Sequence, residues 1–287
     1  MEFMDFPLMP DKPYLSRFKG INLRNGGNAY WDYRFHDALM ERAFRESNVD
    51  YMGYAPAAVF LNGVYFGFME IREVQDQHYI ASNLGLDPNE VTVISSNYLG
   101  WNVIHGDDAP FFEMHQLVLN TDPQSAGFYQ MIDSLIDLEN YMDYIIAETY
   151  WCNGDWANGW NNTKFWHDDQ PGGKWHFMLM DLDFGMGLAG AQPTDDYLYS
   201  AMSGDTYPGQ LFAHIIQNPT FRDAFILRYA DLINLPLQQN IITQMAYQMR
   251  DEVAIDFSRH CQRWGTDCGA LGWILDSRLA WNAQRIQ

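Results

Sequence analysis

The order in which strand-like and helix-like segments follow one another constrains the fold of this chain most strongly. Short strand-like runs begin at residues 18–23, and two further runs occupy residues 163–166 and 174–180. Helical periodicity then dominates from residue 209 to the C-terminus. Strands that precede helices, without regular alternation of the two, are typical of an α+β protein. We therefore expect a smaller lobe of mixed structure and a larger, mainly helical lobe.

The clearest local signal in the smaller lobe is a β-hairpin. Asn62-Gly63 separates apolar runs at residues 57–61 and 64–71, and this dipeptide is the strongest short-range signal for a tight hairpin turn. The second run is apolar at successive positions, so we expect it to be buried on both faces. The other expected elements are a helix at 35–45 capped by Asp32, a helix at 75–83, a strand at 91–95, a loop at 97–110, helical structure from 125 to 151 with Asp137 capping its second half, and helices at 209–217, 219–234, 238–259 and from 271 onwards.

The charge of the chain excludes several classes of partner. Its 287 residues include 37 Asp and Glu against 17 Lys and Arg, a formal net charge of -20, and no run of Lys and Arg is longer than two residues. Nucleic acid and an anionic membrane surface would both be repelled by this charge. A hydrophobic fraction of 47% is too high for a disordered chain.

Targeting segments are not expected in this chain. No apolar run approaches the ~20 residues that a membrane-spanning helix needs. The acidic residues 1–10 lack the basic n-region of a signal peptide.

The cysteines leave two alternatives open. Cys261 and Cys268 are separated by six residues, and they would form a local disulfide if the protein is exported. In a reducing compartment they would remain free thiols. Their spacing and neighbours match no zinc-binding motif.

The chemically informative segment runs from residue 153 to residue 187. A predicted helix leads into a polar loop with Asp155 and several asparagines, and a hairpin then leads into Asp181-Leu182-Asp183-Phe184-Gly185. Phosphoryl transfer from ATP needs carboxylate and amide oxygens that hold Mg²⁺, and a carboxylate that orients the attacking hydroxyl group. Protein kinases take these groups from a loop after a long helix and from Asp-Phe-Gly after the next hairpin, which is the order found here.

A simpler interpretation of the same residues also stays open. Asp155 and Asn158 could only make hydrogen bonds within a turn, and Asp181 and Asp183 could only flank the end of a strand. However, two acids directly after the apolar residues 177–180 are costly to bury without a cation or another partner. The Asp pair therefore favours a functional role more than the asparagines do.

With these motifs the chain resembles the spore coat protein H (CotH) kinase family of atypical protein kinases, which are secreted or associated with coats. The resemblance extends from about residue 17 to the C-terminus. The matching motifs are residues 23–28, 35–39 and 62–67, Arg72-Glu73 with Asp76 and Tyr79, Gly154-Asp155-Trp156, Asn161-Asn162 before Phe165-Trp166, Trp175 leading to residues 181–185, and Arg228-Tyr229, Arg259-His260 and Arg263-Trp264 in the helical tail.

The resemblance implies one kinase-like domain over residues 1–287. Its N-terminal lobe would span about residues 1–74 and be short or incomplete at its N-terminal edge, and its C-terminal lobe would span 75–287. The implied cofactors are ATP and Mg²⁺ or Mn²⁺. The implied reaction is transfer of the γ-phosphate to Ser or Thr of a secreted, coat or surface protein.

The resemblance also implies roles for single residues. Asp155 would be the catalytic residue that positions the acceptor hydroxyl group. Asp181 and Asp183 would bind the metal together with Asn162. The cofactor-binding residues would be Arg24, Glu73, Asn161 and Asn162, although for Arg24 a surface ion pair is an equally good interpretation.

Two departures from the family pattern are visible, and a glycine-rich phosphate loop of the kind found in other kinases is missing. His36 stands where the family more often has Arg, and the loop between Asp155 and Asn162 is about two residues longer than usual, which leaves open which asparagine meets the metal. Gly26-Gly27 is too short for a glycine-rich phosphate loop. Phosphate binding is therefore atypical, or it depends on an element upstream of this chain.

Two further functions compete with the kinase interpretation. The first is a non-catalytic cell-surface or adhesion module on a kinase-like scaffold, and the second is a metal-dependent hydrolase that uses the same acids. The retention of Asp155, Asp181 and Asp183 favours the kinase. Its substrate is expected to be a basic, serine-rich protein, because the acidic chain would attract one.

Overall fold

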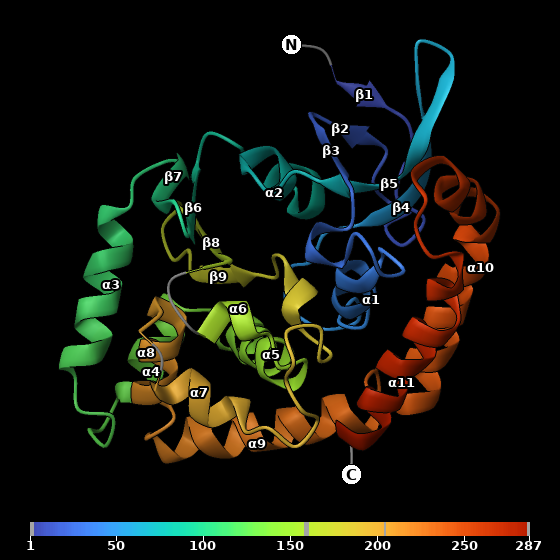
Figure 1. Cartoon of the computed structure of the whole chain (residues 1–287). Coiled ribbons are helices and arrows are strands. Elements are labelled where there is room, and N and C mark those ends of the chain that lie inside the picture. The colour runs from blue at the N-terminus through green and yellow to red at the C-terminus, as the bar shows by residue number, and fades with distance from the viewer. Residues whose placement is uncertain (1–2, 158–160, 204, 286–287) are drawn as a thin grey trace.

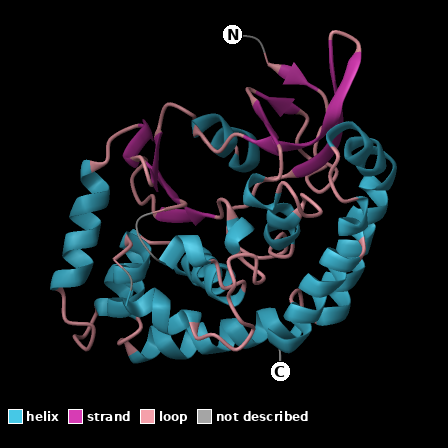
Figure 2. Cartoon of the chain, viewed as in Figure 1, coloured by secondary structure: helices cyan, strands magenta, loops and turns pink. Residues whose placement is uncertain are grey.

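The computed structural model describes residues 3–157, 161–203 and 205–285 (Figure 1). Strands gather in the upper half of the view, and helices line the left, lower and right margins (Figure 2). The mixture of small sheets with a larger helical part confirms the predicted α+β, kinase-like fold class.

The N-terminal sheet has three antiparallel strands in the order β3-β5-β4, namely β3 (Ile21–Arg24), β4 (Tyr54–Leu61) and β5 (Val64–Glu73). Asn62 and Gly63 form the turn between β4 and β5 with φ of 51° and 77°, because a type I′ turn needs positive φ at both positions. The predicted hairpin is therefore confirmed. The short strands β1 (Met4–Asp5) and β2 (Arg17–Phe18) pair separately.

Helix α1 (His36–Arg42) follows β3 and the 3-10 turn η1 (Gly27–Ala29), and all seven of its residues are buried. The prediction that Asp32 caps this helix is wrong, because its N-cap is Phe35. Arg34 has φ of 71°, which lies outside helical geometry and delays the start of the helix. Asp32 instead accepts a hydrogen bond of 2.8 Å from the backbone N–H of Tyr33.

A second sheet contains four antiparallel strands in the order β7-β6-β8-β9. These are β6 (Val91–Asn97), β7 (Gly100–His105), β8 (Thr163–Asp168) and β9 (Trp175–Met178). The prediction of a loop at residues 97–110 is wrong, because β7 lies within it. β7 is an edge strand without a fully buried residue, so its sequence lacks the buried and exposed alternation that identifies a strand.

Helices make up most of the remainder. They are α2 (Gln77–Leu84), α3 (Ala109–Asn120), α4 (Phe128–Leu135), α5 (Leu138–Tyr150), α6 (Gly154–Ala157), α7 (Tyr197–Ser203), α8 (Tyr207–Ile215), α9 (Pro219–Asn234), α10 (Gln239–Trp264) and α11 (Trp273–Arg285), with the 3-10 turns η2 (Leu182–Phe184) and η3 (Cys268–Leu271). Asp137 caps α5 as predicted, by accepting a 3.0 Å hydrogen bond from the N–H of Asn140. The expected helical region at 125–151 is thus divided into α4 and α5, and α3, α6 and α7 were not predicted.

Helix α10 attaches the C-terminal part of the chain to the N-terminal hairpin, as its path along the right of Figure 1 indicates. The indole N–H of Trp264 donates to the carbonyl of Phe66 at 2.8 Å, and the backbone N–H of Phe68 donates to Nδ1 of His260 at 3.1 Å. The hydroxyl of Tyr65 donates to the carbonyl of Asp256 at 3.1 Å. These hydrogen bonds therefore link helix α10 to strand β5.

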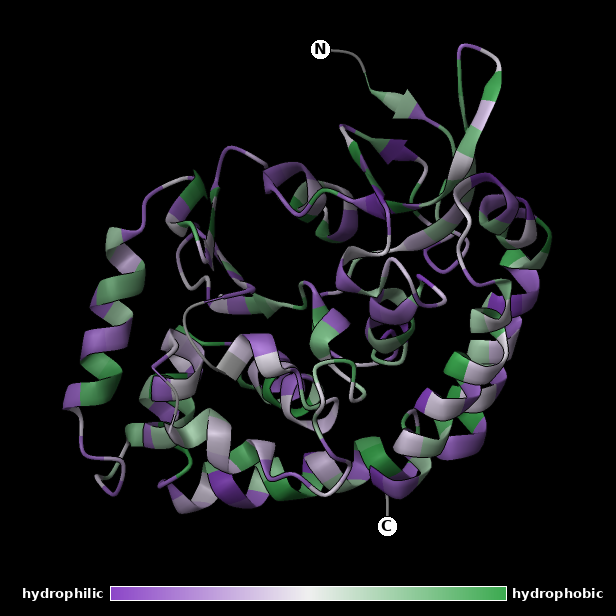
Figure 3. Cartoon of the chain, viewed as in Figure 1, coloured by the Kyte–Doolittle hydropathy of each residue, from purple (hydrophilic) through white to green (hydrophobic). Residues whose placement is uncertain are grey.

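One large apolar core runs through both halves of the chain. It joins side chains of α1, β5, α5, β9, α10 and α11, for example Leu39, Phe68, Ile145, Phe177 and Leu275. Apolar and polar segments alternate along the helices in Figure 3, as expected for helices with one buried face. The division into lobes at residue 74 stays a prediction.

Two further sequence-level questions concern the thiols and the membrane. Cys152, Cys261 and Cys268 are free thiols, and burial together with a hydrogen bond to Cys268 raises the pKa of Cys261 to about 11. Among the described residues, no helix is long and apolar enough to span a membrane.

Candidate active site

The guanidinium of Arg24 lies at the centre of an acidic cluster. Arg24, at the end of β3, forms ion pairs through Nη2 with Asp181 and, at 3.3 Å, with Oδ2 of Asp183. Its Nη1 lies 3.6 Å from Oδ2 of Asp37 on α1. The two acids that follow the apolar strand are therefore brought together as predicted, and Arg24 is the cation that accompanies them. Asp181 is 29% exposed and Asp183 is fully buried, so Asp181 is the carboxylate that a ligand can reach.

The backbone conformation directs the carboxylates of Asp181 and Asp183 towards Nη2 of Arg24. Asp181 has φ of 58°, a left-handed conformation that aspartate tolerates better than most residues. The chain then enters η2, and the backbone N–H of Leu182 donates to Oδ1 of Asp37 at 2.7 Å. Helix α1 thus fixes the segment that carries both acids.

The Gly26-Gly27 turn supports Asp183 and, as expected, forms no glycine-rich phosphate loop. The backbone N–H of Asn28 donates to Oδ2 of Asp183 at 2.6 Å, and its side-chain amide donates to Oδ1 at 3.3 Å. Gly27 has φ of 57°, and a Cβ atom there would overlap Oδ2 of Asp183 and lie 2.5 Å from Nη2 of Arg24. Only glycine lets the backbone approach this closely.

This close approach predicts a large effect for Gly27→Ala. Overpacking and the positive φ should together lower the free energy of unfolding by about 2–3 kcal/mol. Gly63→Ala is the matched control, because Gly63 also has positive φ, 77°, but has open space around it; it should lose only about 1 kcal/mol. Urea unfolding measures both values. Equal losses in the two variants would show that the contact with Asp183 costs nothing.

A second, fully buried arginine links the sheet to α1. Nη1 of Arg72 on β5 lies 2.7 Å from Oδ2 of Asp37, and its Nη2 lies 2.7 Å from Oε1 of Glu41. Glu70 approaches Nη1 at 3.5 Å. Asp37 therefore touches both arginines and couples the Arg24 cluster to the core. This network was not predicted, although Asp37 and Glu41 stand at i, i+4 spacing around an apolar centre, residues 38–40, and acids at this spacing share one face of a helix.

Burial controls the protonation of these acids. It raises the pKa of Glu41 to about 8 and that of Glu70 to about 7, although Arg72 acts in the opposite direction. Burial and the charge of Asp181 raise the pKa of Asp183 to about 7. For Asp37, burial is outweighed by Arg24 and Arg72, which lower its pKa. Asp37 is therefore the acid that stays ionised between the two arginines.

The pKa of Glu70 predicts a pH-dependent stability. Its pKa is about 7 in the folded chain and about 4.3 in an unfolded one, so ionisation costs folded-state stability as the pH rises through this interval. We expect the stability of Glu70→Gln relative to the wild type to rise by about 1–3 kcal/mol between pH 5 and pH 8. Urea unfolding at both pH values is the measurement, with Glu113→Gln, exposed on α3, as control. A stability difference that does not change with pH would refute this assignment.

The predicted catalytic loop holds its carboxylate by two amides. Asp155 lies in α6, and its Oδ2 accepts hydrogen bonds from the amide groups of Asn161 at 2.6 Å and Asn162 at 2.9 Å. The predicted loop residues are thus brought together, except that Asn158 lies outside the described residues. The side-chain oxygen Oδ1 of Asn161 accepts a hydrogen bond of 3.0 Å from the backbone N–H of Tyr98.

The buried side chain of Glu148 contacts the residue at which this loop begins, Asn153. The amide of Asn153 donates to Oε2 of Glu148 at 2.8 Å, and Glu148 is fully buried at the end of α5. Burial raises the pKa of Glu148 well above its ordinary value. The buried side chain of Glu148 therefore holds the start of the loop through Asn153.

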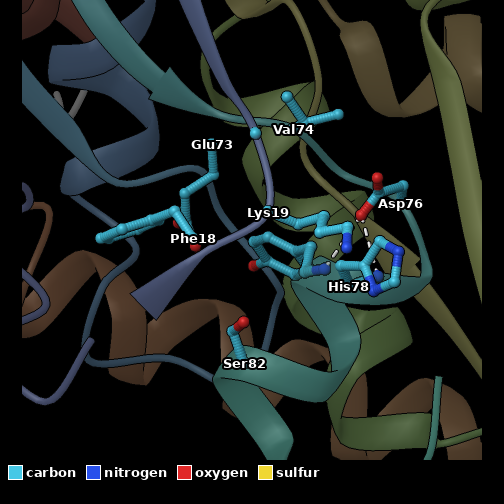
Figure 4. Close-up of a pocket in the computed structure, with 9 residues that line it drawn as sticks. Phe18, Lys19, Glu73, Val74, Asp76, His78 and Ser82 are labelled. Atoms are coloured by element: carbon cyan, nitrogen blue, oxygen red, sulfur yellow. Dashed lines mark hydrogen bonds between the residues drawn. The ribbon is translucent and has the colours of Figure 1, made fainter. Parts of the chain in front are cut away.

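Glu73 lies outside both clusters. Its Oε2 accepts from Nζ of Lys12 at 2.6 Å and from the N–H of Gly53 at 2.7 Å, and its Oε1 accepts from Asn83 at 2.8 Å. It lines a pocket beside Lys19, Asp76 and His78 (Figure 4). That pocket has a volume of about 20 Å³, which is room for about one water molecule, so it is too small for a nucleotide.

A larger groove opens beside the Arg24 cluster. It has a volume of about 560 Å³ and is lined by the β3 residues Asn22, Leu23 and Arg24, by Asn25 and Gly27, by Met52, Met69 and Arg72, and by Asp181. Ligand sites commonly have volumes of roughly 300–1,000 Å³ and combine apolar walls with a few polar groups. The volume and the mixed lining of the groove therefore lie within the range of small-molecule sites.

The comparison with protein families decides what this arrangement belongs to. A family model described as CotH kinase protein matches residues 9–268. The chain belongs to this family. Its CotH region includes α1, both sheets and α10, and with them Arg24, Asp155, Asp181 and Asp183. No curated protein was found to match the chain.

The CotH assignment makes this a kinase-like protein, and it confirms the resemblance seen in the sequence. The roles of single residues remain predictions. Among the described residues, no group of three or more His, Cys, Asp and Glu side chains is arranged to hold a metal ion.

Proposed function

We propose that this CotH protein is an atypical protein kinase that transfers the γ-phosphate of ATP to Ser or Thr of a protein. The observation that carries the proposal is the position of Arg24, which lies between Asp181, Asp183 and Asp37 at the edge of a groove of about 560 Å³. A cation on the strand before the first helix, paired with an acid of that helix, can contact a phosphate. The acids that follow β9 would then lie beside the same phosphate.

The residues fit a divalent cation held against a nucleotide. Mg²⁺ prefers oxygen ligands and is commonly bound by one or two carboxylates together with substrate phosphates and water. Asp181 and Asp183 already converge on one positive group, Nη2 of Arg24. When bound, Mg²⁺ or Mn²⁺ would neutralise charge on the phosphates. Asp37, the third carboxylate near Arg24, is fully buried and held by Arg72 at 2.7 Å, so Asp181 and Asp183 are the carboxylates assigned to the metal.

The asparagines of the loop differ in the oxygen that they can offer. The side-chain oxygen Oδ1 of Asn161 already accepts a hydrogen bond from the backbone N–H of Tyr98. Among the residues that the structure describes, none donates a hydrogen bond to Oδ1 of Asn162. Asn162 also has φ of 54°, a left-handed conformation that asparagine tolerates better than most residues. We therefore assign the metal-binding role to Asn162 and a positioning role to Asn161.

Asp155 is assigned to the acceptor hydroxyl group. Asn161 and Asn162 both bind its Oδ2, so they fix the orientation of the carboxylate and direct Oδ1 away from them. Half-buried at the start of the loop, Asp155 can accept a proton from an incoming hydroxyl group. The acceptor would be a basic, serine-rich protein of a coat, surface or secreted assembly, because the net charge of -20 attracts such a chain.

Calorimetry with ATP tests the binding half of this proposal. We expect ATP to bind with a dissociation constant between about 1 μM and 1 mM in the presence of Mg²⁺ or Mn²⁺, and to raise the melting temperature. Arg24→Met should abolish the binding heat, whereas Arg250→Met, half-exposed on α10, should not change it. No binding heat with either metal would exclude the kinase.

One observation favours a non-catalytic surface module as the second candidate. Arg24 pairs with both Asp181 and Asp183 and offsets part of their charge without a metal. A scaffold that had lost catalysis could be held together in this way. The absence of ATP binding from a folded, soluble protein would favour this module.

A further inference from the structure

The tip of the β6–β7 hairpin combines two features that seldom occur together. Tyr98 and Leu99 are the two turn residues between the paired Asn97 and Gly100. Such turns normally carry Gly, Asn or Asp, because these residues suit turn geometry and water. Here Tyr98 is 82% exposed and Leu99 is 80% exposed. The pairing of Asn97 with Gly100 closes the turn, and the N–H of Leu99 donates to Oδ1 of Asn97 at 2.8 Å, so the turn does not depend on the side chains of Tyr98 and Leu99.

The same tip is connected to the proposed catalytic carboxylate through one side chain. The backbone N–H of Tyr98 donates to Oδ1 of Asn161 at 3.0 Å, and Nδ2 of Asn161 donates to Oδ2 of Asp155 at 2.6 Å. A single asparagine thus spans the space between the tip and Asp155. The hydrogen bond uses the backbone of Tyr98, so its aromatic ring is not needed for it.

We propose that Tyr98 and Leu99 form a subsite for an apolar side chain of the acceptor polypeptide, next to the phosphorylated Ser or Thr. This inference rests on the proposed function, because it takes the acceptor hydroxyl group to lie at Asp155. An extended chain advances roughly 3.3 Å per residue, so a residue one or two positions from the acceptor can reach the tip. The occupant is therefore an extended peptide with a large apolar residue close to its acceptor.

The physical gain comes from covering two exposed side chains at once. Tyr supplies a large, rigid contact surface at low cost in conformational entropy. Basic residues further along the peptide would add long-range attraction to the acidic protein. The apolar contact supplies selectivity among basic chains, which charge alone cannot provide.

Peptide binding tests the subsite without depending on catalysis. The probes are two fluorescein-labelled peptides, Lys-Arg-Phe-Ser-Phe-Lys-Arg and Lys-Arg-Gly-Ser-Gly-Lys-Arg, titrated with the full chain and read by fluorescence anisotropy. We expect the Phe peptide to bind the wild type about tenfold more tightly than the Gly peptide. The double variant Tyr98→Ser with Leu99→Ser should bind both peptides equally. It keeps the backbone N–H at residue 98, so its binding of the Gly peptide should equal that of the wild type.

Ile255→Ser is the matched control, because Ile255 is 85% exposed on α10 and should keep the preference for Phe. A preference that survives in the Tyr98 and Leu99 variant, or that the wild type lacks, overturns the subsite. Phosphate transfer from labelled ATP to the two peptides separates the two proposals. If the preference depends on Tyr98 and Leu99 while the wild type transfers no phosphate, the subsite is supported and the kinase proposal fails.

Discussion

Asp155→Asn should reduce phosphate transfer by about 10²–10⁴-fold, the usual contribution of a positioned general base. The substitution keeps the size of the side chain and an oxygen that can accept from Asn161 and Asn162, which now bind Oδ2 of Asp155. It removes the negative charge that would orient and deprotonate the acceptor hydroxyl group. The dissociation constant for ATP should change less than about threefold, because Asp155 makes no contact with the Arg24 cluster among the described residues.

Single-turnover transfer from labelled ATP measures the first effect, and calorimetry measures the second. Asp251→Asn is the control, because Asp251 is 69% exposed on α10 and pairs with Arg250. It should leave both quantities unchanged. Loss of ATP binding together with transfer in Asp155→Asn would mean that Asp155 acts on the nucleotide and not on the acceptor.

Arg72→Leu should destabilise the folded chain more than Gly27→Ala does. The guanidinium is 1% exposed and lies 2.7 Å from both Asp37 and Glu41. Its removal leaves buried carboxyl groups without their cation, and breaking a buried pair in this way typically costs about 3–5 kcal/mol. Much of that cost should fall on Asp37, because Arg24 alone would then have to hold its charge.

Urea unfolding measures this loss of stability. Arg222→Ala is the matched control, because Arg222 is 49% exposed and pairs with the exposed Asp223; it should change the free energy of unfolding by less than about 1 kcal/mol. Arg72→Lys keeps the charge but loses the bidentate geometry, so it should fall between the two. If Arg72→Leu is no less stable than Arg222→Ala, the network contributes nothing to folding.

The parts of the fold that local chemistry determines could be predicted from the sequence. Asn62-Gly63 requires a tight turn wherever it joins two apolar runs, and Asp137 caps α5 through a contact three residues away. By contrast, β7 is an exposed edge strand, so neither its periodicity nor its apolar content identifies it. The start of α1 was predicted to within one residue, but the cap assigned to Asp32 was wrong because the left-handed conformation of Arg34 leaves no trace in composition.

The same distinction between local and long-range contacts applies to the candidate site. The order of the predicted helix, loop and hairpin identified Asp155, Asp181 and Asp183 as candidate site residues. The cost of burying two acids predicted that a cation or another partner lies beside Asp181 and Asp183. That this cation is Arg24, more than 150 positions away in sequence, depends on how β3 packs against the segment after β9. Glu73 was predicted to bind the cofactor because it lies in a family motif. In the folded chain its carboxylate instead pairs with Lys12, outside the Arg24 cluster.

Transfer of labelled γ-phosphate from ATP tests the proposed kinase activity most directly. The wild type would be incubated with Mg²⁺ or Mn²⁺ and a basic, serine-rich polypeptide, and the label would be located by phosphoamino-acid analysis. We expect label on Ser or Thr of the acceptor with the wild type and a loss of at least about 100-fold with Asp155→Asn. Folded wild-type protein that binds ATP but labels neither the acceptor nor itself, or an Asp155→Asn variant that transfers phosphate as fast as the wild type, would contradict this activity.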